Sequence, residues 1–251
     1  MPRLLLRGAS VTMARHHPLR PAAVPARRAV LIPVKRFHRA KTRLAGALSA
    51  PERRSLAAAL CADLFAAVAR VPGVERVFVV SGEPQALAWA RQRAWSVVVE
   101  RRQVSEKASV NRATRHCIAA GFGTLLRLPI DLPLAQPEDF AAVFAAAGPA
   151  PAAVLVPSRD GTGTNALLRS PPDAFPALFG AGSLRLHLAA AHRGGVRTRV
   201  LRLPRLAWDV DDWSDLRAVA PLARPGSAFA AWLLASRRVS NALGMGGRVR
   251  S

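Results

Sequence analysis

Five lysine and arginine side chains lie in one short segment, directly after an apolar run. Residues 32–44 read IPVKRFHRAKTRL, and the cations are Lys35, Arg36, Arg39, Lys41 and Arg43. Lysine supplies a mobile point charge, and arginine a planar fork that can hold two phosphate oxygens. Because ligands bind beyond the carboxyl ends of the strands in an open α/β sheet, the segment predicts a phosphate-binding loop. Solvated loop charges on a very basic protein are the alternative interpretation.

Acidic residues are scarce, yet two groups of them follow apolar runs. Asp131 lies between two prolines in LPIDLPL, and Asp209, Asp211 and Asp212 follow the run LAW. Magnesium prefers oxygen ligands and is commonly held by one or two carboxylates plus substrate phosphates. The two groups therefore predict a magnesium site, with a helix or turn cap as the alternative role of Asp131.

Two further segments combine glycine with hydroxyl groups. In RDGTGTN (159–165), glycines allow a close approach of the backbone to a ligand, although an ordinary tight hairpin is the alternative. In FGAGSLRLH (179–187), a glycine turn leads to Ser183, the expected N-cap of a helix. The free N–H groups at the start of such a helix form an anion site. His187 follows one turn later, either as a phosphate donor or as a packed core histidine.

Alternating strands and helices must position these residues. Apolar runs predict strands over 29–34, 77–81, 96–100, 124–128, 152–156, 165–168 and 199–203. Helical patterns occupy 84–93, 110–120, 137–147, 183–191 and 212–219, and another helix begins after the capping box of Ser49 and Glu52. Strands separated by helices imply right-handed crossovers and a mostly parallel sheet with helices on both faces. We expect one α/β domain over residues 29–222.

The two flanking segments and the two cysteines indicate what lies outside the domain and in which compartment the protein works. Residues 1–28 carry no acid and predict a basic, disordered extension, with a transit peptide or a start at Met13 as alternatives. Residues 223–251 predict a flexible basic tail with a short helix around 229–234. Cys61 and Cys117 are isolated, as expected of core residues in a cytoplasmic protein. No apolar run reaches the roughly 18 residues that span a bilayer, so no membrane partner is expected.

The net charge of +22 comes from 37 Lys and Arg against 15 Asp and Glu. These cations are scattered, without the aromatic interleaving of single-strand binders, so we expect attraction for small polyanions and no nucleic-acid partner. A basic nucleic-acid-binding module is the alternative from another class. The chain lacks GxGxxG, GxxxxGK[ST], HExxH and GxSxG, which argues against dinucleotide redox, P-loop and serine-hydrolase chemistry.

Several of these segments occur in the order and at the spacing of one known family. They are IPVKRF…AKTRL, LPIDLPL, GTGTNALL, PPDAF…FGAGS…H and DVD. Over about residues 30–216 the chain resembles the CofC/FbiD guanylyltransferases of coenzyme F-420 biosynthesis, in the MobA-like nucleotidyltransferase group. The resemblance implies a single Rossmann-like nucleotidyltransferase domain of the MobA-like or GT-A-like kind. It also implies magnesium and transfer of GMP from GTP to 2-phospho-L-lactate, phosphoenolpyruvate or 3-phospho-D-glycerate. A related transferase acting on molybdopterin or a sugar phosphate is the alternative.

The resemblance assigns roles to individual residues. The nucleotide would be bound by Lys35, Lys41, Arg43 and Asn111. Magnesium would be bound by Asp131, Asp209 and Asp211, and the acid by Thr164, Gly180 and Ser183. Lys41, Arg43 and Asp131 would be the catalytic groups. The chain departs from the family at Ser109-Val110-Asn111, where Gly-Leu-Asn is usual.

Overall fold

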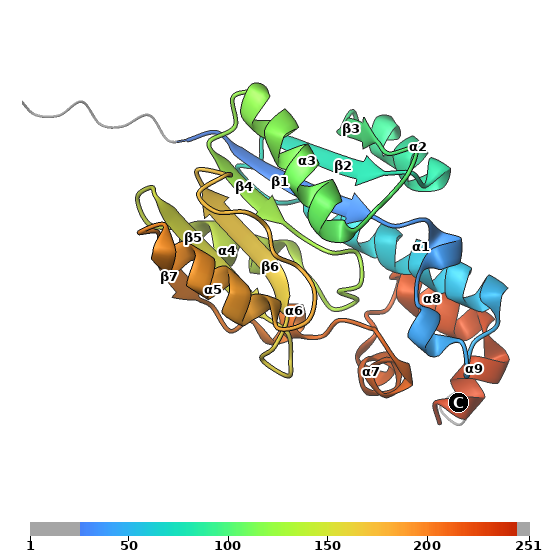
Figure 1. Ribbon diagram of the computed structural model, residues 1–251. Helices are drawn as coiled ribbons and strands as arrows, with labels where there is room; N and C mark the ends of the chain where they lie inside the picture. The colour runs from blue at the N-terminus through green and yellow to red at the C-terminus, as the bar shows by residue number, and fades with distance from the viewer. Residues whose placement is uncertain (1–25, 245–251) are drawn as a thin grey trace, which may run out of the picture.

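The structure, a computed structural model, describes residues 26–244, which form a seven-stranded sheet (Figure 1). The strands across it are β3 (Ser96–Val99), β2 (Arg76–Ser81), β1 (Arg28–Val34), β4 (Thr124–Arg127), β6 (Thr164–Ser170), β5 (Ala152–Pro157) and β7 (Arg197–Val200). β1, β4, β5 and β6 are almost wholly buried, which explains the continuous apolar runs of β1 and β5. The predicted α/β class is confirmed.

The sheet is parallel except at β6, which is antiparallel to both of its neighbours, β4 and β5. β5 and β6 form a hairpin through residues 158–163. Because β6 runs backwards, its first residues, Thr164 and Asn165, lie at the edge where the parallel strands end. The reversed strand therefore brings the GTGTN segment to the same edge as Asp131.

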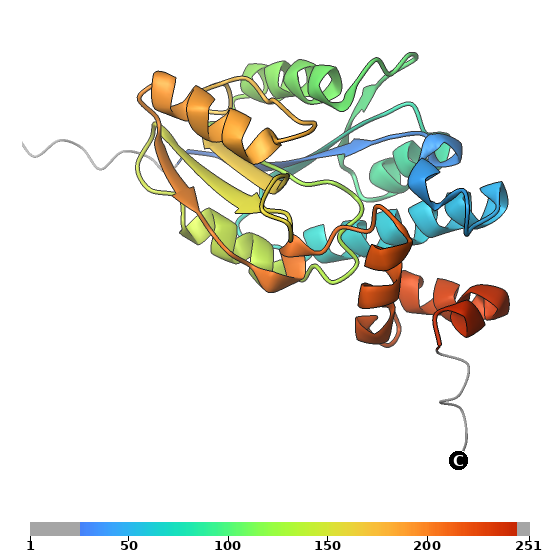
Figure 2. The same cartoon turned by 60° about the horizontal axis from the view of Figure 1, so that its bottom comes forward.

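Helices cover both faces of the sheet (Figure 2). One face packs against α3 (Glu106–Ala119) and α5 (Ser183–Arg193), and the other against α1 (Ala50–Val68), α2 (Pro84–Gln92) and α4 (Pro137–Ala145). Successive residues of β1 serve both cores, since Leu31 packs with α3 and Ile32 with α1. Two 3-10 turns, η1 (Phe37–Arg39) and η2 (Thr42–Leu44), carry the basic segment from β1 to α1.

The largest differences from the predicted element boundaries are at α3 and β7. α3 begins at Glu106 rather than Val110, because the hydroxyl of Ser105 accepts from the Ala108 backbone N–H at 3.1 Å and caps the helix. β7 covers Arg197–Val200 rather than 199–203, since its pairing with β5 ends where α6 (Pro204–Ala207) approaches. Neither shift changes the order of the elements.

The prediction of a flexible tail after residue 222 is wrong for the described residues. The helix predicted around 229–234 is α8 (Ala228–Ala235), which packs on α1 and is followed by α9 (Arg237–Ala242). The carboxylate of Asp63 in α1 accepts from the backbone N–H groups of Ala228 and Phe229, both at 2.8 Å. The last predicted helix is α7 (Trp213–Val219), followed by the 3-10 turn η3 (Ala220–Leu222). Residues 1–25 of the expected extension and 245–251 of the tail lie outside the described residues.

In the described part of the chain, no helix combines the length and the hydropathy needed to cross a bilayer. Cys61 and Cys117 are buried and free, as predicted.

Candidate active site

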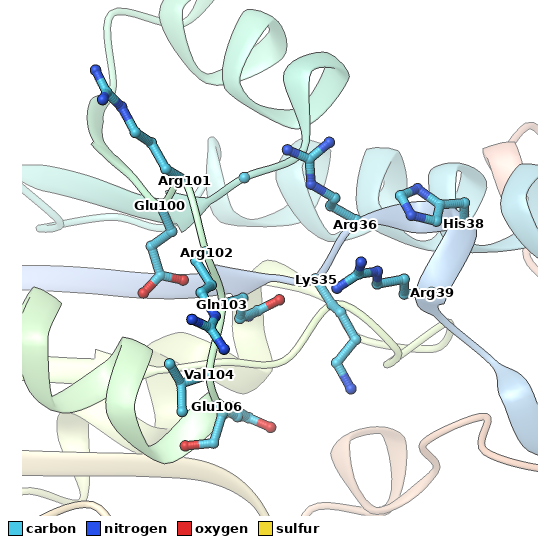
Figure 3. Close-up of a pocket in the computed structure, with 12 residues that line it drawn as sticks. Lys35, Arg36, His38, Arg39, Glu100, Arg101, Arg102, Gln103, Val104 and Glu106 are labelled. Carbon is cyan, nitrogen blue, oxygen red and sulfur yellow. The ribbon is translucent and has the colours of Figure 1, made fainter.

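Three adjoining pockets form a cleft along the carboxyl edge of the sheet. The β1–α3 pocket (about 670 Å³) lies between the residues that follow β1 and residues 100–106 (Figure 3). The central pocket (about 330 Å³) contains Lys41, Arg43, Asp131 and Asp211. The hairpin pocket (about 700 Å³) lies among the β5–β6 hairpin, residues 179–183 and residues 207–215. Lys35 and Glu106 line all three pockets, so the cleft is continuous.

Lys41 joins two of the predicted acids. Its ammonium nitrogen lies 2.9 Å from Asp131 Oδ2 and 3.7 Å from Asp211 Oδ1, and it also donates to the carbonyl oxygen of Val210. Val210 in turn donates its backbone N–H to the carbonyl oxygen of Asp131 at 3.0 Å, which fixes the two acidic segments side by side. Lys41 has a left-handed backbone (φ 56°), a conformation that non-glycine residues adopt rarely.

The acids carry more negative charge than Lys41 balances. Burial, together with the charge of Asp131, raises the pKa of Asp209 to about 6. The same two causes raise the pKa of Asp211. Burial also acts on Asp131, but the attraction of Lys41 outweighs it and leaves the pKa of this carboxyl below its usual value. Asn165 donates to Asp209 Oδ1 at 3.1 Å and so fixes this carboxylate at the cleft wall.

The donor set fits a hard divalent cation held jointly with a ligand. Among residues 26–244, no three acidic, histidine or cysteine side chains are close enough to hold a metal by themselves. Asp131, Asp209 and Asp211 nevertheless line one pocket with excess negative charge, and magnesium commonly takes one or two carboxylates plus phosphate oxygens. Asp212 is not part of this set, because its side chain caps α7.

The basic residues assigned to the nucleotide differ in their surroundings. Lys35 is exposed and lines every pocket of the cleft. Arg43 is 73% exposed at its side chain and pairs with Asp211 at 3.2 Å. Lys41 is 5% exposed at its side chain and engaged by protein acceptors. Lys35 and Arg43 are thus open to an incoming phosphate, while Lys41 already bridges the acids.

Asn111 is not brought to the cleft. Its amide nitrogen donates to the Ala177 carbonyl oxygen at 3.1 Å, and its amide oxygen accepts from the Ala177 N–H at 2.9 Å. The side chain therefore fastens the loop before α5 to α3. A contact between Asn111 and the nucleotide stays a prediction.

Thr164, Ser183 and His187 form one buried hydrogen-bond chain. The backbone N–H of Leu178 donates to His187 Nε2 at 2.8 Å, so the ring proton must be on Nδ1, which is 3.1 Å from Thr164 Oγ1. The hydroxyls of Thr164 and Ser183 are 3.3 Å apart. The chain has three donor hydrogens but two internal contacts, and no other acceptor in residues 26–244 takes the third. One hydroxyl proton of this pair, whose residues line the hairpin pocket, therefore has no acceptor in the described part of the protein.

The structure corrects the predicted role of Ser183 in its helix. Gly182, with a φ of 65°, is the N-cap of α5, and Ser183 is its first helical residue. Its hydroxyl is directed to Thr164 rather than to the helix backbone. Gly180 (φ 132°) also lines the hairpin pocket, so all three residues assigned to the acid lie together there.

His187 is a packed core histidine, one of the two roles left open by the sequence. It is fully buried, with the ring of Phe179 at a centroid distance of 4.9 Å. Burial, with the nearby charges of Arg169 and Arg127, lowers its pKa from 6.5 to about 4. The ring is thus neutral at neutral pH, as its acceptor role requires.

The low pKa of His187 predicts a pH-dependent stability. The unfolded chain takes up a proton below pH 6.5 and the folded chain only near 4, so stability is full above about pH 6.5 and falls between these values. The loss is at most about 3 kcal/mol. Urea unfolding from pH 4 to 7.5 checks this, and His187→Gln is expected to flatten the dependence. An equally steep fall in that variant would show that other groups cause it.

Two charged residues at the cleft were missed by sequence reasoning. Arg127 is buried inside β4, and Glu106 begins α3. The available signal was the arginine within the apolar run TLLRL, where a strand buried on both faces has no place for an unpaired charge.

The sequence profile of the family described as "Guanylyl transferase CofC like" matches residues 28–221, most of the chain. The chain belongs to this family. Residues 28–221 of the guanylyl transferase domain run from β1 through α7 and include every residue assigned above to the site.

Curated relatives agree with this membership. A phosphoenolpyruvate guanylyltransferase from Rubrobacter xylanophilus is 40% identical over 74% of this chain and 90% of its own. A 3-phospho-D-glycerate guanylyltransferase from Colwellia psychrerythraea is 30% identical over 78% of this chain and 92% of its own.

Solved structures show the same fold. A protein from Desulfovibrio desulfuricans G20, assigned as a nucleotide-diphospho-sugar transferase, has a TM-score of 0.65 at 17% identity, covering 87% of this chain and 96% of that one. A nucleotidyl transferase from Methanothermobacter has a TM-score of 0.54 at 18% identity, covering 78% and 96%. The predicted nucleotidyltransferase fold is thereby confirmed.

Proposed function

We propose that this guanylyl transferase moves GMP from GTP to the phosphate of a small phosphorylated carboxylic acid and releases pyrophosphate. One observation carries the proposal: a single cleft contains exposed cations, the Lys41-bridged acids and the Thr164–Ser183 hydroxyl pair. The names of the relatives support phosphoenolpyruvate or 3-phospho-D-glycerate as the acid, and 2-phospho-L-lactate remains a candidate from the resemblance.

The pockets divide between the two substrates. The triphosphate of GTP would lie in the central pocket against Lys35 and Arg43, with the nucleoside in the β1–α3 pocket. The acid would lie in the hairpin pocket, where Thr164, Gly180 and Ser183 face it. Asp131 lines both the central and the hairpin pocket, so the phosphate of the acid and the α-phosphorus of GTP can meet there.

The transfer step needs positioning more than proton chemistry. A phosphate oxygen of the acid attacks the α-phosphorus of GTP, and the new phosphorus–oxygen bond forms as the bond to the β-phosphate oxygen breaks. The bonding electron pair leaves with pyrophosphate. A phosphate dianion is already a nucleophile, so no general base is required, and electrostatic stabilisation of the leaving group dominates.

Magnesium is the cofactor that we propose for the acids. Asp131 with Asp209 or Asp211 would hold it, and the bound ion would neutralise charge on the attacking and leaving oxygens. Lys41 orients Asp131 and Asp211 toward each other, and Arg43 adds positive charge beside the phosphates.

Two wider statements belong to the proposal. The family resemblance supports a place in coenzyme F-420 biosynthesis. The free, buried cysteines suit a reducing compartment and support a cytoplasmic location.

Ser183→Ala is expected to raise the KM for the acid by roughly tenfold, because one hydrogen bond to an ionised ligand is lost. The KM for GTP should change little, since Ser183 lines only the hairpin pocket. Initial rates with each substrate varied in turn measure both constants. A variant in which the GTP constant moves instead would show that the pockets are assigned the wrong way round.

A substrate panel tests the function itself. Purified protein is incubated with magnesium, each nucleoside triphosphate and, as acceptor, each of the three acids, molybdopterin or a sugar phosphate, and products are identified by mass spectrometry. We expect pyrophosphate and a guanylylated acid with GTP. Product from molybdopterin or a sugar phosphate alone would contradict the proposal, as would salt-sensitive DNA binding without any GTP turnover.

A further inference from the structure

A buried cation, Arg127, lies in the cleft beside the residues proposed to bind the acid. Arg127 is the last residue of β4, is 4% exposed and lines both the central and the hairpin pocket. Burial lowers the pKa of its guanidinium to about 9, which still leaves it charged at neutral pH. Its place between the two pockets is where the acid substrate must extend from the transfer point to Ser183.

The guanidinium of Arg127 lies over an aromatic ring, and its hydrogen-bond donors are only partly paired. Its central carbon lies 3.9 Å from the centroid of the Phe179 ring, a cation–π contact. One terminal nitrogen is 3.4 Å from the Thr164 carbonyl oxygen, and the other pairs with Glu106. Within residues 26–244, Nε has no hydrogen-bond partner. The cation is thus preorganised by its neighbours while retaining capacity for an anion.

Glu106 is the carboxylate that pairs with this guanidinium, through one of its terminal nitrogens. It comes from the first turn of α3, and its side chain is 38% exposed, whereas that of Arg127 is 5% exposed. The partner is therefore at the surface and able to leave, while the cation is fixed. A ligand carboxylate has the same planar pair of oxygens and would compete for the same site.

We propose that Arg127 binds the carboxylate of the acid substrate, and that Glu106 is a counter-ion which this carboxylate displaces. The inference rests on the proposed function and identifies the residue that recognises the carboxylate of the acid substrate. The phosphate of the acid must remain near Asp131, where the transfer occurs, which leaves the carboxylate for Arg127, Thr164 and Ser183.

Arg127→Met and Glu106→Gln test the proposal in opposite directions. Arg127→Met fills the buried space with an apolar chain and should raise the KM for the acid roughly 10- to 100-fold, with the KM for GTP within threefold. Glu106→Gln keeps the shape but removes the competing charge, and should lower the KM for the acid several-fold. When Arg127→Met is already present, adding Glu106→Gln should leave the KM for the acid unchanged.

Arg159→Met is the matched control. Arg159 is an arginine at the rim of the same cleft, also stacked on an aromatic ring (Trp208) and ion-paired (Asp215), but it is 55% exposed at its side chain. It should change the KM for the acid less than threefold. An equal rise in Arg159→Met and Arg127→Met would reduce the effect to general charge and overturn the proposal.

A substrate without the carboxylate gives the decisive readout. Glycerol 3-phosphate keeps the phosphate and three-carbon chain of 3-phosphoglycerate but has a hydroxymethyl group in place of the carboxylate. Arg127→Met should reduce the preference for the acid over this analogue at least tenfold. The proposal would be overturned if Arg127→Met left this preference unchanged or raised the KM for GTP instead. A higher KM for the acid in Glu106→Gln would also overturn it. Absence of product with wild-type protein and every acid would instead reject the proposed function.

Discussion

Asp131→Asn is expected to slow GTP-dependent pyrophosphate release by at least about 10³-fold while the protein remains folded. The substitution removes a carboxylate that accepts from Lys41 and lines the central pocket, where we propose that the transfer occurs. Loss of such stabilisation costs several kcal/mol in the transition state, and about 4 kcal/mol corresponds to this factor. Pyrophosphate release under saturating GTP and acid measures the rate.

Asp160→Asn is the matched control for that experiment. Asp160 lies in the hairpin pocket, but its carboxylate accepts from Ser158 and Thr162 within its own turn. Its loss should leave turnover within a few-fold of wild type. Circular dichroism shows whether each variant is folded. A folded Asp131→Asn variant with wild-type turnover would refute the role of this acid.

Trp232→Ala should lower the free energy of unfolding by about 3–5 kcal/mol, the cost of removing a large core side chain. Trp232 in α8 is 7% exposed, stacks with Phe229 and donates its ring N–H to Ser55 of α1 at 2.9 Å. Urea unfolding followed by circular dichroism gives the value.

Leu234→Ala on the same helix is the control, because Leu234 is 73% exposed. It should change the free energy of unfolding by less than about 0.5 kcal/mol. Equal effects of the two substitutions would mean that α8 does not pack on α1 in solution.

Most elements of the fold could be predicted because local patterns and tertiary packing agree. β1 and β2 are continuous apolar runs, and the capping box of Ser49 and Glu52 marks the start of α1. The direction of β6 was harder to predict, since strand patterns carry no sign of direction and a short hairpin is what reverses it. α8 was identified as a helix, but its docking depends on Asp63 and Ser55, over 160 residues earlier in the chain.

The acidic part of the site could be predicted, although only Asp131 follows a strand, β4, and Asp211 lies in the loop after α6. Asp131 and Asp211 were expected to approach each other, and both contact Lys41. Arg127 was missed because the position of its guanidinium in the cleft depends on contacts with Glu106 and Phe179, which come from other parts of the chain. His187 stayed open between two roles, because the Leu178 N–H that decides between them belongs to a loop without a regular pattern.

Anomalous diffraction from crystals grown with Mn²⁺ and GTP tests the central claim most directly. The account predicts one ion at coordination distance from a carboxylate oxygen of Asp131, from one of Asp209 or Asp211, and from a phosphate of GTP. An ion held by the phosphates alone, with all three carboxylates uncoordinated, would contradict it.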